Sequence, residues 1–593
     1  MPASDEYNLM VAPPQFLAAD AGGVSWTVRA DVARELLPRL RDSGSGPEFE
    51  GKGEIVKTGP HRTVYRLQLP SDEFYLKHFR TYHWKGLLLN LVRPTKAESE
   101  WHAALRIAAL GLPTFEPVAL GSVRRRGLVA DSFLVSRGIP DAIPVDEFAD
   151  QHLRPVIDHE LDPAGAEKQC RLRQALAQAV GELCARLHVA GVEHADFHAA
   201  NILVRLERDG TPRLWLIDLH RVYFREQLTD HQRYRNLTFL HQFFAGFSTR
   251  ADRLRFYQAY LRVWNAGRQS ATGTTKPSRR VDQAHDIATL ESYLESGAEK
   301  GWKRADRAFR RGNRHVKKLD NSRSRCRGVA ALDAGWLKGL RANPEQLFGG
   351  ESIVWHKQSA KHRVAEIQVP AAAGPSLGRA FYKCIERVGL WRNWLSPFRD
   401  APVRKAWEFG HALLRRQIDT PRPLVCVEKC EEQPRRSYLL TEAVPATLTA
   451  ADFLRQTWPT LSPVEQRQWV TVHSRRLAVQ MRRLHDAGFD HRDLKFSNLL
   501  VSEVTDDARV WFLDLDGMRR WKRLPDQRMV QNLARISISA RAHGLGSLAD
   551  RVRFLKWYLG AHRAADWKTW WHRITETSAR KLALNQKRGR AIH

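Results

Sequence analysis

The feature that most constrains the fold of this chain is an internal repeat, because two similar halves are expected to fold into two similar units. GEIVKTGPHRTVYRLQLP (residues 53–70) resembles ESIVWHKQSAKHRVAEIQVP (residues 351–370), and both stretches end at a proline. The match continues over FYLKHF and FYKCI, whose lysines, Lys77 and Lys383, align. A tryptophan follows each of these lysines after the same interval of 24 residues. The chain is therefore a tandem duplication.

The repeat includes two pairs of polar motifs. HADFHAANILV (194–204) matches HRDLKFSNLLV (491–501), and RLWLIDLHRV (213–222) matches RVWFLDLDGM (509–518). In the first pair an asparagine follows an aspartate after five residues and precedes an apolar run. Asp and Asn are common turn residues, so one such motif alone is explained by loop structure. The recurrence of the whole set in one order indicates a function.

Each half has strand-like patterns first and helix-like patterns later. TVYRLQL and AEIQV alternate apolar and polar residues, the period typical of half-buried strands. Helix-like stretches follow at 96–110 and 404–415, and longer ones at 170–191 and 464–488 end in glycine just before the HxD motifs. A strand-rich front and a helical back predict an α+β fold with two lobes in each half.

The length of 593 residues predicts at least two large domains, because a single hydrophobic core does not extend over such a chain. From the repeat we predict an N-terminal extension (1–47), a first domain (48–314), a basic linker (315–344) and a second domain (345–593). The linker is inferred from the charged and small polar residues of HVKKLDNSRSRCRG.

The net charge predicts an anionic partner. A formal charge of +30 and a pI near 10.2 imply attraction to nucleic acid, anionic lipid or a phosphorylated glycan. The 19 tryptophans give weak support for a membrane surface, since some lie among basic residues at 391–399, 554–560 and 566–573. No stretch approaches the ~20 apolar residues of a bilayer span, and the nearest candidate, 86–92, is far too short.

The cysteines and the N-terminus predict a cytoplasmic protein. The six cysteines are scattered without a CxxC pair, so they support neither a disulfide framework nor a zinc site. The first 20 residues contain no basic segment leading into an apolar core, so no signal peptide is expected.

The polar residues of the repeat meet the requirements of phosphoryl transfer. Transfer from ATP needs a cation on the phosphates, Mg²⁺ held by carboxylate and amide oxygens, and a carboxylate aimed at the attacking hydroxyl. Mg²⁺ binds through few protein ligands, so two in each half are sufficient. In chain order, the two sets are Lys77, Asp196, Asn201 and Asp218, and Lys383, Asp493, Asn498 and Asp514.

This arrangement resembles the protein-kinase-like fold, whose signatures are a strand lysine, an HxDxxxxN loop and a DFG-type aspartate. Within that superfamily the chain is similar to bacterial lipopolysaccharide core kinases, the Kdo and heptose kinase family. The similarity lies in HADFHAANIL, in IDLHR and LDLDG where DFG is expected, in LPTFEPV and DTPRPL, and in YRNL and VQNLARI. It covers roughly residues 48–314 and 345–590 and implies two tandem bilobal kinase-like domains.

The resemblance implies a role for each polar residue, with ATP and Mg²⁺ as cofactors. The catalytic bases would be Asp196 and Asp493, the phosphate anchors Lys77 and Lys383, and the Mg²⁺ ligands Asn201 with Asp218 and Asn498 with Asp514. The acceptor would be a sugar hydroxyl of lipopolysaccharide core or a similar anionic glycolipid. The protein would act in the cytoplasm, peripheral to the inner membrane, where its charge of +30 suits a polyanionic substrate, and nucleic acid is not expected as a partner.

The chain contains no GxGxxG phosphate loop. Basic side chains at the first hairpin could contact phosphates instead, or they could be solvated hairpin charges. These residues are Lys57, His61 and Arg62 in the first half, and Lys357, Lys361 and Arg363 in the second.

The glutamate that should pair with the strand lysine is ambiguous. Glu98 and Glu100 compete in the first half, whereas the second half has Arg404 and Ala406 at these positions. The second half offers Glu408 instead, which lies one helical turn beyond the position of Glu98 and so on the same face. This difference weakens the case for catalysis in the second half.

The two loops also differ two residues after the aspartate, where the first has His198 and the second Lys495. The halves are therefore expected to accept different hydroxyls, or one of them to be regulatory. Two alternatives stay open: a kinase for a protein or small-molecule acceptor, and a pseudokinase-like binding module in which no phosphate is transferred.

Overall fold

The chain forms two compact units, described separately. Unit 1 contains residues 1–154 and 165–299, and unit 2 contains residues 155–164 and 300–593. The structure, a computed structural model, describes residues 15–41, 53–59, 61–82, 84–153, 166–244, 248–272, 283–313, 315–350, 352–359, 361–374, 378–387, 402–430, 435–445, 447–503 and 508–588.

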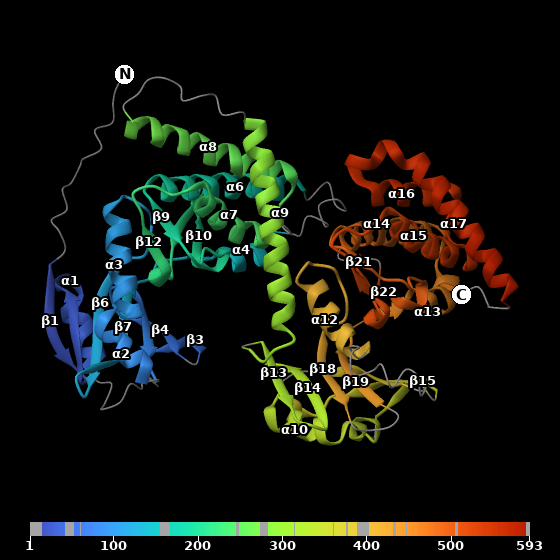
Figure 1. Ribbon diagram of the computed structural model, residues 1–593, viewed down its shortest axis with the longest axis horizontal. Coiled ribbons are helices and arrows are strands. Elements are labelled where there is room, and N and C mark those ends of the chain that lie inside the picture. Colours follow the sequence, from blue (N-terminus) through green and yellow to red (C-terminus); the bar gives the residue numbers. More distant parts are fainter. Residues whose placement is uncertain are drawn as a thin grey trace. The chain divides into compact units, whose positions relative to one another are not determined.

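The front of unit 1 is a seven-stranded antiparallel sheet, drawn in blue and cyan in Figure 1, with the order β1-β2-β6-β7-β5-β4-β3. Its core is built around the buried rings of Trp26, Phe74 and Phe133. The strands are β1 (Phe16–Ala21), β2 (Val24–Arg29), β3 (Glu54–Gly59), β4 (Arg62–Gln68), β5 (Glu73–Arg80), β6 (Pro117–Arg125) and β7 (Leu128–Arg137).

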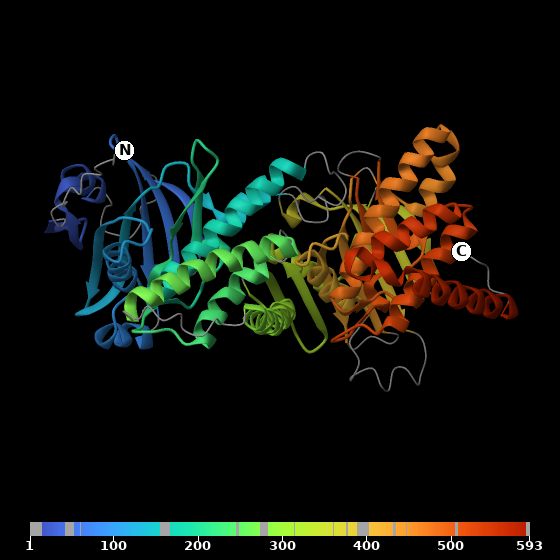
Figure 2. The ribbon, with the colours of Figure 1, turned by 90° about the horizontal axis from the view of Figure 1, so that it is seen from above.

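The back of unit 1 is helical and carries two small sheets, β11-β10-β8 and β12-β9. Figures 1 and 2 both show α8 alongside α6. The two helices can pack closely because Gly181 has no side chain: a Cβ there would lie 2.5 Å from the carbonyl oxygen of Phe256. The helices are α1 (Ala30–Arg41), α2 (Trp84–Val92), α3 (Lys96–Ala109), α4 (Val145–His152), α6 (Ala166–Val189), α7 (Asp230–Phe244), α8 (Arg250–Thr272) and α9 (Gln283–Ala308), of which residues 300–308 belong to unit 2. The short strands are β8 (Ile143–Pro144), β9 (Val192–His194), β10 (Ile202–Leu206), β11 (Pro212–Leu216) and β12 (Val222–Phe224).

Unit 2 repeats this plan. Its large sheet has the order β13-β14-β18-β19-β17-β16-β15, which matches the first sheet position for position, and the small sheets are β20-β22-β23 and β21-β24. Its strands are β13 (Val316–Asp320), β14 (Ser324–Val329), β15 (Val354–Gln358), β16 (His362–Gln368), β17 (Arg379–Arg387), β18 (Pro423–Lys429), β19 (Arg435–Glu442), β20 (Thr447–Thr449), β21 (Phe489–Asp490), β22 (Leu499–Ser502), β23 (Val510–Phe512) and β24 (Arg519–Arg520). Its helices are α10 (Ala334–Ala342), α12 (Pro402–Leu414), α13 (Ala450–Gln456), α14 (Pro463–Asp486), α15 (Asp526–Ala542), α16 (Leu548–Arg563) and α17 (Trp567–Lys587).

The predicted tandem of bilobal α+β domains is confirmed, but the boundaries differ from the prediction. The described part of the expected extension (1–47) forms β1, β2 and α1 of the first unit, and the expected linker (315–344) forms β13, β14 and α10 of the second. The linker prediction is wrong because the charged residues here are interspersed with the buried Val316, Cys326 and Val329, which is a strand pattern. The many charged residues make this pattern hard to recognise in the sequence.

The tryptophan-rich stretches serve mainly the core. In 554–560, Leu555 and Leu559 are buried, and in 566–573 Trp570 is buried, whereas 391–399 lies outside the described residues. Trp557, Trp567 and Trp571 are half-buried and pack against the same core, so these two stretches do not support a membrane surface. Of the helices that the structure describes, none has both the length and the apolar composition needed to cross a bilayer.

Buried histidines predict that the fold loses stability in mild acid. Burial lowers the pKa of His188, His411 and His485 to about 3 and that of His473 to about 4, so all four are neutral in the folded protein. Between their ordinary pKa of 6.5 and these values the unfolded chain binds more protons than the folded one. Stability is therefore fully present above pH 6.5 and falls below it, by about 1.4 kcal/mol per pH unit for each histidine.

Thermal unfolding followed by circular dichroism at a series of pH values checks this. The His485→Gln variant should show a shallower decline of Tm with acidity than the unmodified protein. A Tm that stays constant as the pH falls from neutral through 5 would contradict the prediction.

Candidate active site

The HxD loop of unit 1 begins where α6 ends. Gly191 follows that helix at φ 69°, and a Cβ there would lie 1.9 Å from the carbonyl oxygen of Arg225, so the position requires glycine. Gly488 has the same place after α14, with φ 80° and a would-be Cβ 2.3 Å from the carbonyl oxygen of Trp521. The predicted helix-ending glycines thus also permit close packing against the segments that follow IDLHR in unit 1 and LDLDG in unit 2.

The β10–β11 hairpin brings three predicted site residues together in unit 1. The backbone N–H of Ile217 donates to the carbonyl oxygen of Asn201 at 3.0 Å, and Asp218 follows in a left-handed conformation with φ 61°. Asn201 Nδ2 donates to the carbonyl oxygen of Asp196 at 2.8 Å. Within the described ranges the side-chain oxygen of Asn201 accepts no hydrogen bond, so this arrangement leaves it available as a ligand.

A buried asparagine holds the loop in place. Asn236 of α7 accepts from the backbone N–H of His194 and donates to its carbonyl oxygen, both at 3.2 Å. Burial lowers the pKa of His194 to about 4, which keeps its ring neutral, and the Asp196 carboxylate contacts His198 Nε2 at 2.7 Å. Asn236 was not predicted as a site residue, although it lies in the YRNL stretch that carries part of the family resemblance.

Lys77 on β5 forms an ion pair with Glu100 on α3, and its ammonium group also lies 5.3 Å from the centre of the Phe115 ring. Glu100 is fully buried and accepts from the backbone N–H of Leu219 at 3.3 Å, next to Asp218. Glu100 therefore connects the lysine to the turn that carries the predicted metal ligand.

Glu98, the other candidate, does not contact the lysine. Its Oε2 atom accepts from the backbone N–H of Thr95 at 2.7 Å, and the Thr95 hydroxyl accepts from the backbone N–H of Glu98 at 3.2 Å. These reciprocal bonds form a capping box at the start of α3. Glu98 is thus occupied in starting the helix, and Glu100 alone takes the position beside Lys77.

Asp218 is ionised by its surroundings. Both of its oxygens accept from Arg62 Nη1 at 2.9 Å, and Oδ1 lies 2.8 Å from His220 Nδ1. Burial, the largest single influence, raises the pKa of this carboxyl, but the His220 contact and the charges of Lys77 and Arg62 together lower it well below its ordinary value. Glu100, Asp218 and His220 also offer atoms that all lie within 4.8 Å of one another, a spacing that suits a cation.

Unit 2 repeats the backbone of this site. Asn498 Nδ2 donates to the carbonyl oxygen of Asp493 at 2.8 Å, and the backbone N–H of Leu513 donates to the carbonyl oxygen of Asn498 at 2.9 Å. Asp514 then adopts φ 57°, close to the value for Asp218. Lys495 Nζ lies 3.3 Å from the carboxylate of Asp493, where unit 1 has the histidine contact.

The lysine of unit 2 has other partners. Lys383 Nζ lies 2.6 Å from Asp514 and 2.9 Å from Asp516, and these are its ion pairs within the described part of the chain. Burial lowers the pKa of Lys383, but the two carboxylates outweigh it and raise the pKa above its ordinary value. The position equivalent to Glu100 is Ala406, a small buried residue. Unit 2 therefore has no helix carboxylate at this position.

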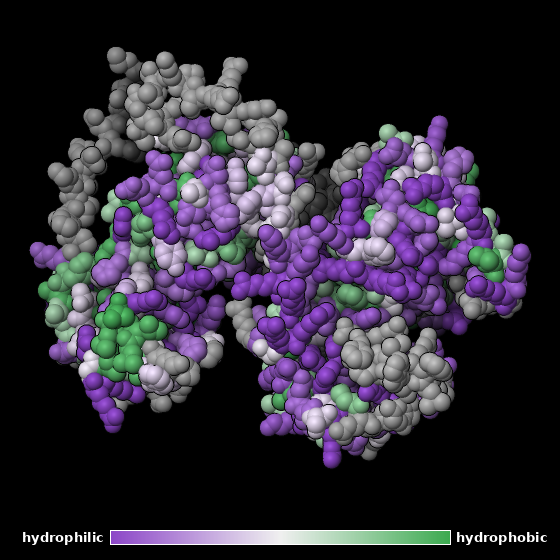
Figure 3. All heavy atoms as spheres, in the orientation of Figure 1, coloured by the Kyte–Doolittle hydropathy of each residue, from purple (hydrophilic) through white to green (hydrophobic). Residues whose placement is uncertain are grey.

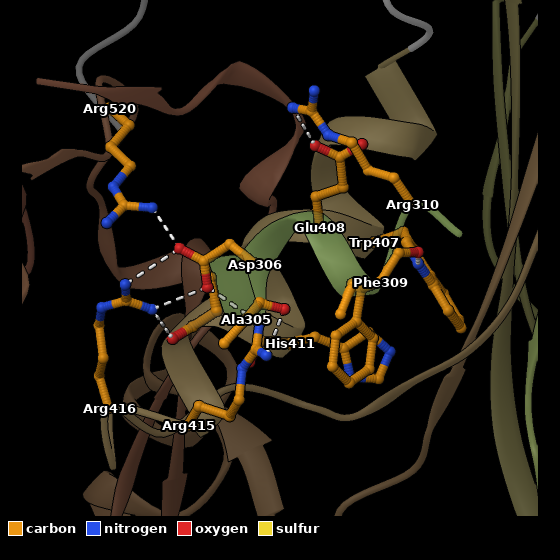
Figure 4. Close-up of polar contacts among 12 residues, drawn as sticks. Ala305, Asp306, Phe309, Arg310, Trp407, Glu408, His411, Arg415, Arg416 and Arg520 are labelled. Carbon is orange, nitrogen blue, oxygen red and sulfur yellow. Dashed lines mark hydrogen bonds and ion pairs between the residues drawn. The ribbon is translucent and has the colours of Figure 1, made fainter. Parts of the chain in front are cut away.

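Glu408 does not replace the missing carboxylate. Its Oε2 atom contacts Arg310 Nη2 at 2.7 Å, as Figure 4 shows, and beside it Trp407 Nε1 donates to the carbonyl oxygen of Phe309 at 3.1 Å. Two residues along an α-helix correspond to a rotation of about 200°. Glu408 consequently lies on a different face of α12 from Ala406 and away from Lys383, contrary to the predicted pairing.

Of the basic hairpin residues proposed as a substitute phosphate loop, Arg62 contacts a predicted site residue, Asp218. Arg363 of unit 2 instead forms two hydrogen bonds with Glu345, at 2.9 and 2.6 Å, and packs over the ring of Phe348. Arg363 stands at the position of Thr63, and His362 stands at the position of Arg62, so unit 2 has no arginine equivalent to Arg62.

Comparison with known proteins finds one family twice in the chain. The model of the lipopolysaccharide kinase (Kdo/WaaP) family matches residues 52–260 and 356–558, which is well over half of the sequence. The chain is 26% identical over 267 residues to lipopolysaccharide core heptose(I) kinase WaaP of Pseudomonas aeruginosa, covering 43% of this chain and 89% of that protein.

Two further relatives have similar coverage. WaaP of Escherichia coli K12 is 23% identical over 219 residues, or 35% of this chain and 78% of that protein. A 3-deoxy-D-manno-octulosonic acid kinase of Vibrio vulnificus is 25% identical over 185 residues, or 30% of this chain and 67% of that protein. Most of the length of each relative is therefore matched by less than half of this chain.

Proposed function

Because this chain belongs to the lipopolysaccharide kinase (Kdo/WaaP) family, we propose that it transfers the γ-phosphoryl group of ATP to a sugar hydroxyl of the lipopolysaccharide core, and that unit 1 performs the transfer. The observation that carries this proposal is the buried ion pair of Lys77 and Glu100 beside Asp218. The acceptor class follows from the names of the relatives, which are heptose and 3-deoxy-D-manno-octulosonic acid kinases. The formal charge of +30 suits an anionic glycolipid.

In this mechanism Asp196 accepts the proton of the attacking sugar hydroxyl. The hydroxyl oxygen then bonds to the γ-phosphorus as the bond to the β-phosphate oxygen breaks, and ADP leaves. Lys77 binds the phosphate oxygens of ATP, and Glu100 holds the lysine in position while it anchors the turn at Leu219. Since Glu100 is fully buried, this pair is shielded from solvent.

Asn201 and Asp218 would hold Mg²⁺. The side-chain oxygen of Asn201 accepts no hydrogen bond from the described residues, and the pKa of Asp218 lies well below its ordinary value, so both groups suit a hard divalent cation. Bound Mg²⁺ would neutralise negative charge on the phosphate oxygens.

For unit 2 we propose a different role, a pseudokinase-like binding module. The missing carboxylate at Ala406 and the pairing of Lys383 with Asp514 and Asp516 favour this role. We further propose that the protein works at the cytoplasmic surface of the inner membrane, where its acceptor is assembled.

The test uses the purified full chain with ATP, Mg²⁺ and detergent-solubilised core glycolipid, and mass spectrometry of the product. A gain of one phosphate on a core sugar is expected. A protein-substrate panel and free sugars provide the competing acceptors. Transfer to a protein or a free sugar, with none to the glycolipid, would overturn the proposed acceptor.

The lysine–glutamate pair can be tested separately from the acceptor. Glu100→Gln removes the charge that holds Lys77, and a lysine displaced from its position should lower kcat/KM by about 10²-fold. Steady-state kinetics with ATP and glycolipid measure this.

Glu98→Gln is the matched control, two residues away on the same helix. Glutamine can also complete a capping box, so the change in stability should be within about 0.5 kcal/mol and the activity should be retained. Equal losses in both variants would contradict the assigned role of Glu100.

A further inference from the structure

Helix α2 exposes many apolar side chains. Trp84, Leu88, Leu89, Leu91 and Val92 are between 48 and 79% exposed, and Tyr82 just before the helix is 61% exposed. Figure 3 shows the resulting hydrophobic patch over α2. Contiguous apolar surface of this kind marks an interaction site.

The helix is held to the sheet by a polar residue, which leaves the leucines outside. Asn90 Nδ2 donates to the carbonyl oxygen of Val129 at 3.0 Å and lies 3.5 Å from the Thr81 hydroxyl. The backbone N–H of Thr81 donates to the carbonyl oxygen of Ala130 at 3.0 Å. The start of β7 thus positions α2.

The surroundings of α2 are basic. The β6–β7 turn, which leads into the same part of β7, exposes three consecutive arginines, Arg124, Arg125 and Arg126. Arg93, directly after α2, is also exposed. Neither residues 80–97 nor residues 117–130 contain an aspartate or a glutamate. Asp131, directly after the second range, is buried and lies 3.4 Å from Arg125. The exposed charges of these segments are therefore cationic.

We propose that α2 and the arginines of the β6–β7 turn form a docking surface for an anionic lipid bilayer. The apolar side chains enter the interface, and the guanidinium groups contact lipid phosphates. Trp84 and Tyr82 are residue types that favour the boundary between headgroups and acyl chains. A second copy of this chain fits the surface less well, because symmetric pairing would bring the two arginine clusters together.

Docking through α2 would place the membrane beside the catalytic elements of unit 1. Only Arg93 and Pro94 separate the end of α2 from Thr95, the N-cap of α3, and α3 carries Glu100. This step rests on the proposed function, since it assumes an acceptor that is part of a membrane. The docking itself needs neither ATP nor the acceptor.

Co-sedimentation of the full chain with vesicles tests the surface. One vesicle population contains equal parts of phosphatidylglycerol and phosphatidylcholine, and the other contains phosphatidylcholine alone. The variant Leu88→Ser/Leu89→Ser/Leu91→Ser should bind the anionic vesicles about tenfold more weakly than the unmodified chain. Arg124→Gln/Arg125→Gln/Arg126→Gln should also weaken this binding, and added salt should have a smaller effect on it than on the unmodified chain.

The matched control is Leu17→Ser/Leu206→Ser/Leu254→Ser, whose leucines are 38 to 48% exposed elsewhere in unit 1. It should bind anionic vesicles as the unmodified chain does. Undiminished binding by the α2 leucine variant, or equal loss in the control, would overturn the docking surface. So would a dimer of the unmodified chain that the α2 leucine variant loses, because the occupant would then be a second copy.

Two further measurements keep this result separate from the proposed function. The α2 leucine variant should phosphorylate detergent-solubilised glycolipid at the unmodified rate, and Asp196→Asn should bind vesicles normally. Absent phosphorylation by the unmodified chain would refute the proposed function alone, and absent vesicle binding would refute the docking surface alone.

Discussion

Replacing Asp196 by asparagine should lower kcat for glycolipid phosphorylation by about 10²- to 10⁴-fold, the contribution typical of a general base. The substitution keeps the size of the side chain and removes its ability to accept the hydroxyl proton. The loop should keep its shape, because Asn201 donates to the backbone carbonyl of residue 196 rather than to its side chain. Single-turnover kinetics measure the loss, and an unchanged Tm shows that the fold is retained.

Asp493→Asn is the companion variant in unit 2. Because Ala406 stands at the position of Glu100 and Lys383 pairs with Asp514 and Asp516, we expect kcat to stay within about twofold of the unmodified value. Loss of activity in Asp493→Asn alone would assign catalysis to unit 2, and full activity in the double variant would remove both aspartates from the mechanism.

Replacing Asp306 by alanine should lower the free energy of unfolding of unit 2 by about 3 kcal/mol, the lower end of the cost of leaving buried charges unpaired, because these side chains are only partly buried. Figure 4 shows this carboxylate among three arginines: Arg415 at 2.9 Å, Arg416 at 3.0 Å, and Arg520. Burial lowers the pKa of Arg415 and Arg416, which shows that their charges are costly in this environment. Without Asp306 the three arginines remain partly desolvated but lose the carboxylate that neutralises their charges.

Urea unfolding of the full chain, followed by tryptophan fluorescence, measures this loss as a transition at a lower urea concentration. The control is Glu576→Ala, which breaks an exposed pair with Arg580 on α17 and should change stability by less than about 0.5 kcal/mol. If Asp306→Ala also changed the free energy of unfolding by less than about 0.5 kcal/mol, the arginine cluster would not depend on this carboxylate.

The sequence predicted the fold and the loops because both depend on local spacing. Asp196 and Asn201 are five residues apart on one loop, and a hairpin of two apolar strands brings Asp218 next to Asn201. The repeat showed that the same set occurs twice. It did not show that each unit begins with an additional hairpin and helix, because β13 and β14 carry many charges on their exposed face.

The choice between Glu98 and Glu100 needed the tertiary structure. Residues two apart on a helix point to different sides, so one faces the sheet and the other does not. The spacing of 23 residues from Lys77 to Glu100 does not reveal which side that is, since it includes α2 and two turns. The capping box at Thr95 engages Glu98 at the first turn of α3, and its pattern, TKAE at 95–98, is a signal that the sequence itself contains.

The sequence by itself determined the tandem duplication, the α+β class of each half and the order of the lysine, the HxD loop and the second aspartate. These follow from periodicity, motif spacing and motif order, which are properties of the sequence and do not depend on how its parts pack. Only the tertiary structure decided that Lys77 pairs with Glu100, that Lys383 pairs with Asp514 and Asp516, and that the leucines of α2 face outward. Those contacts depend on which face of each helix meets the sheet, and that is set by packing between residues far apart in the chain.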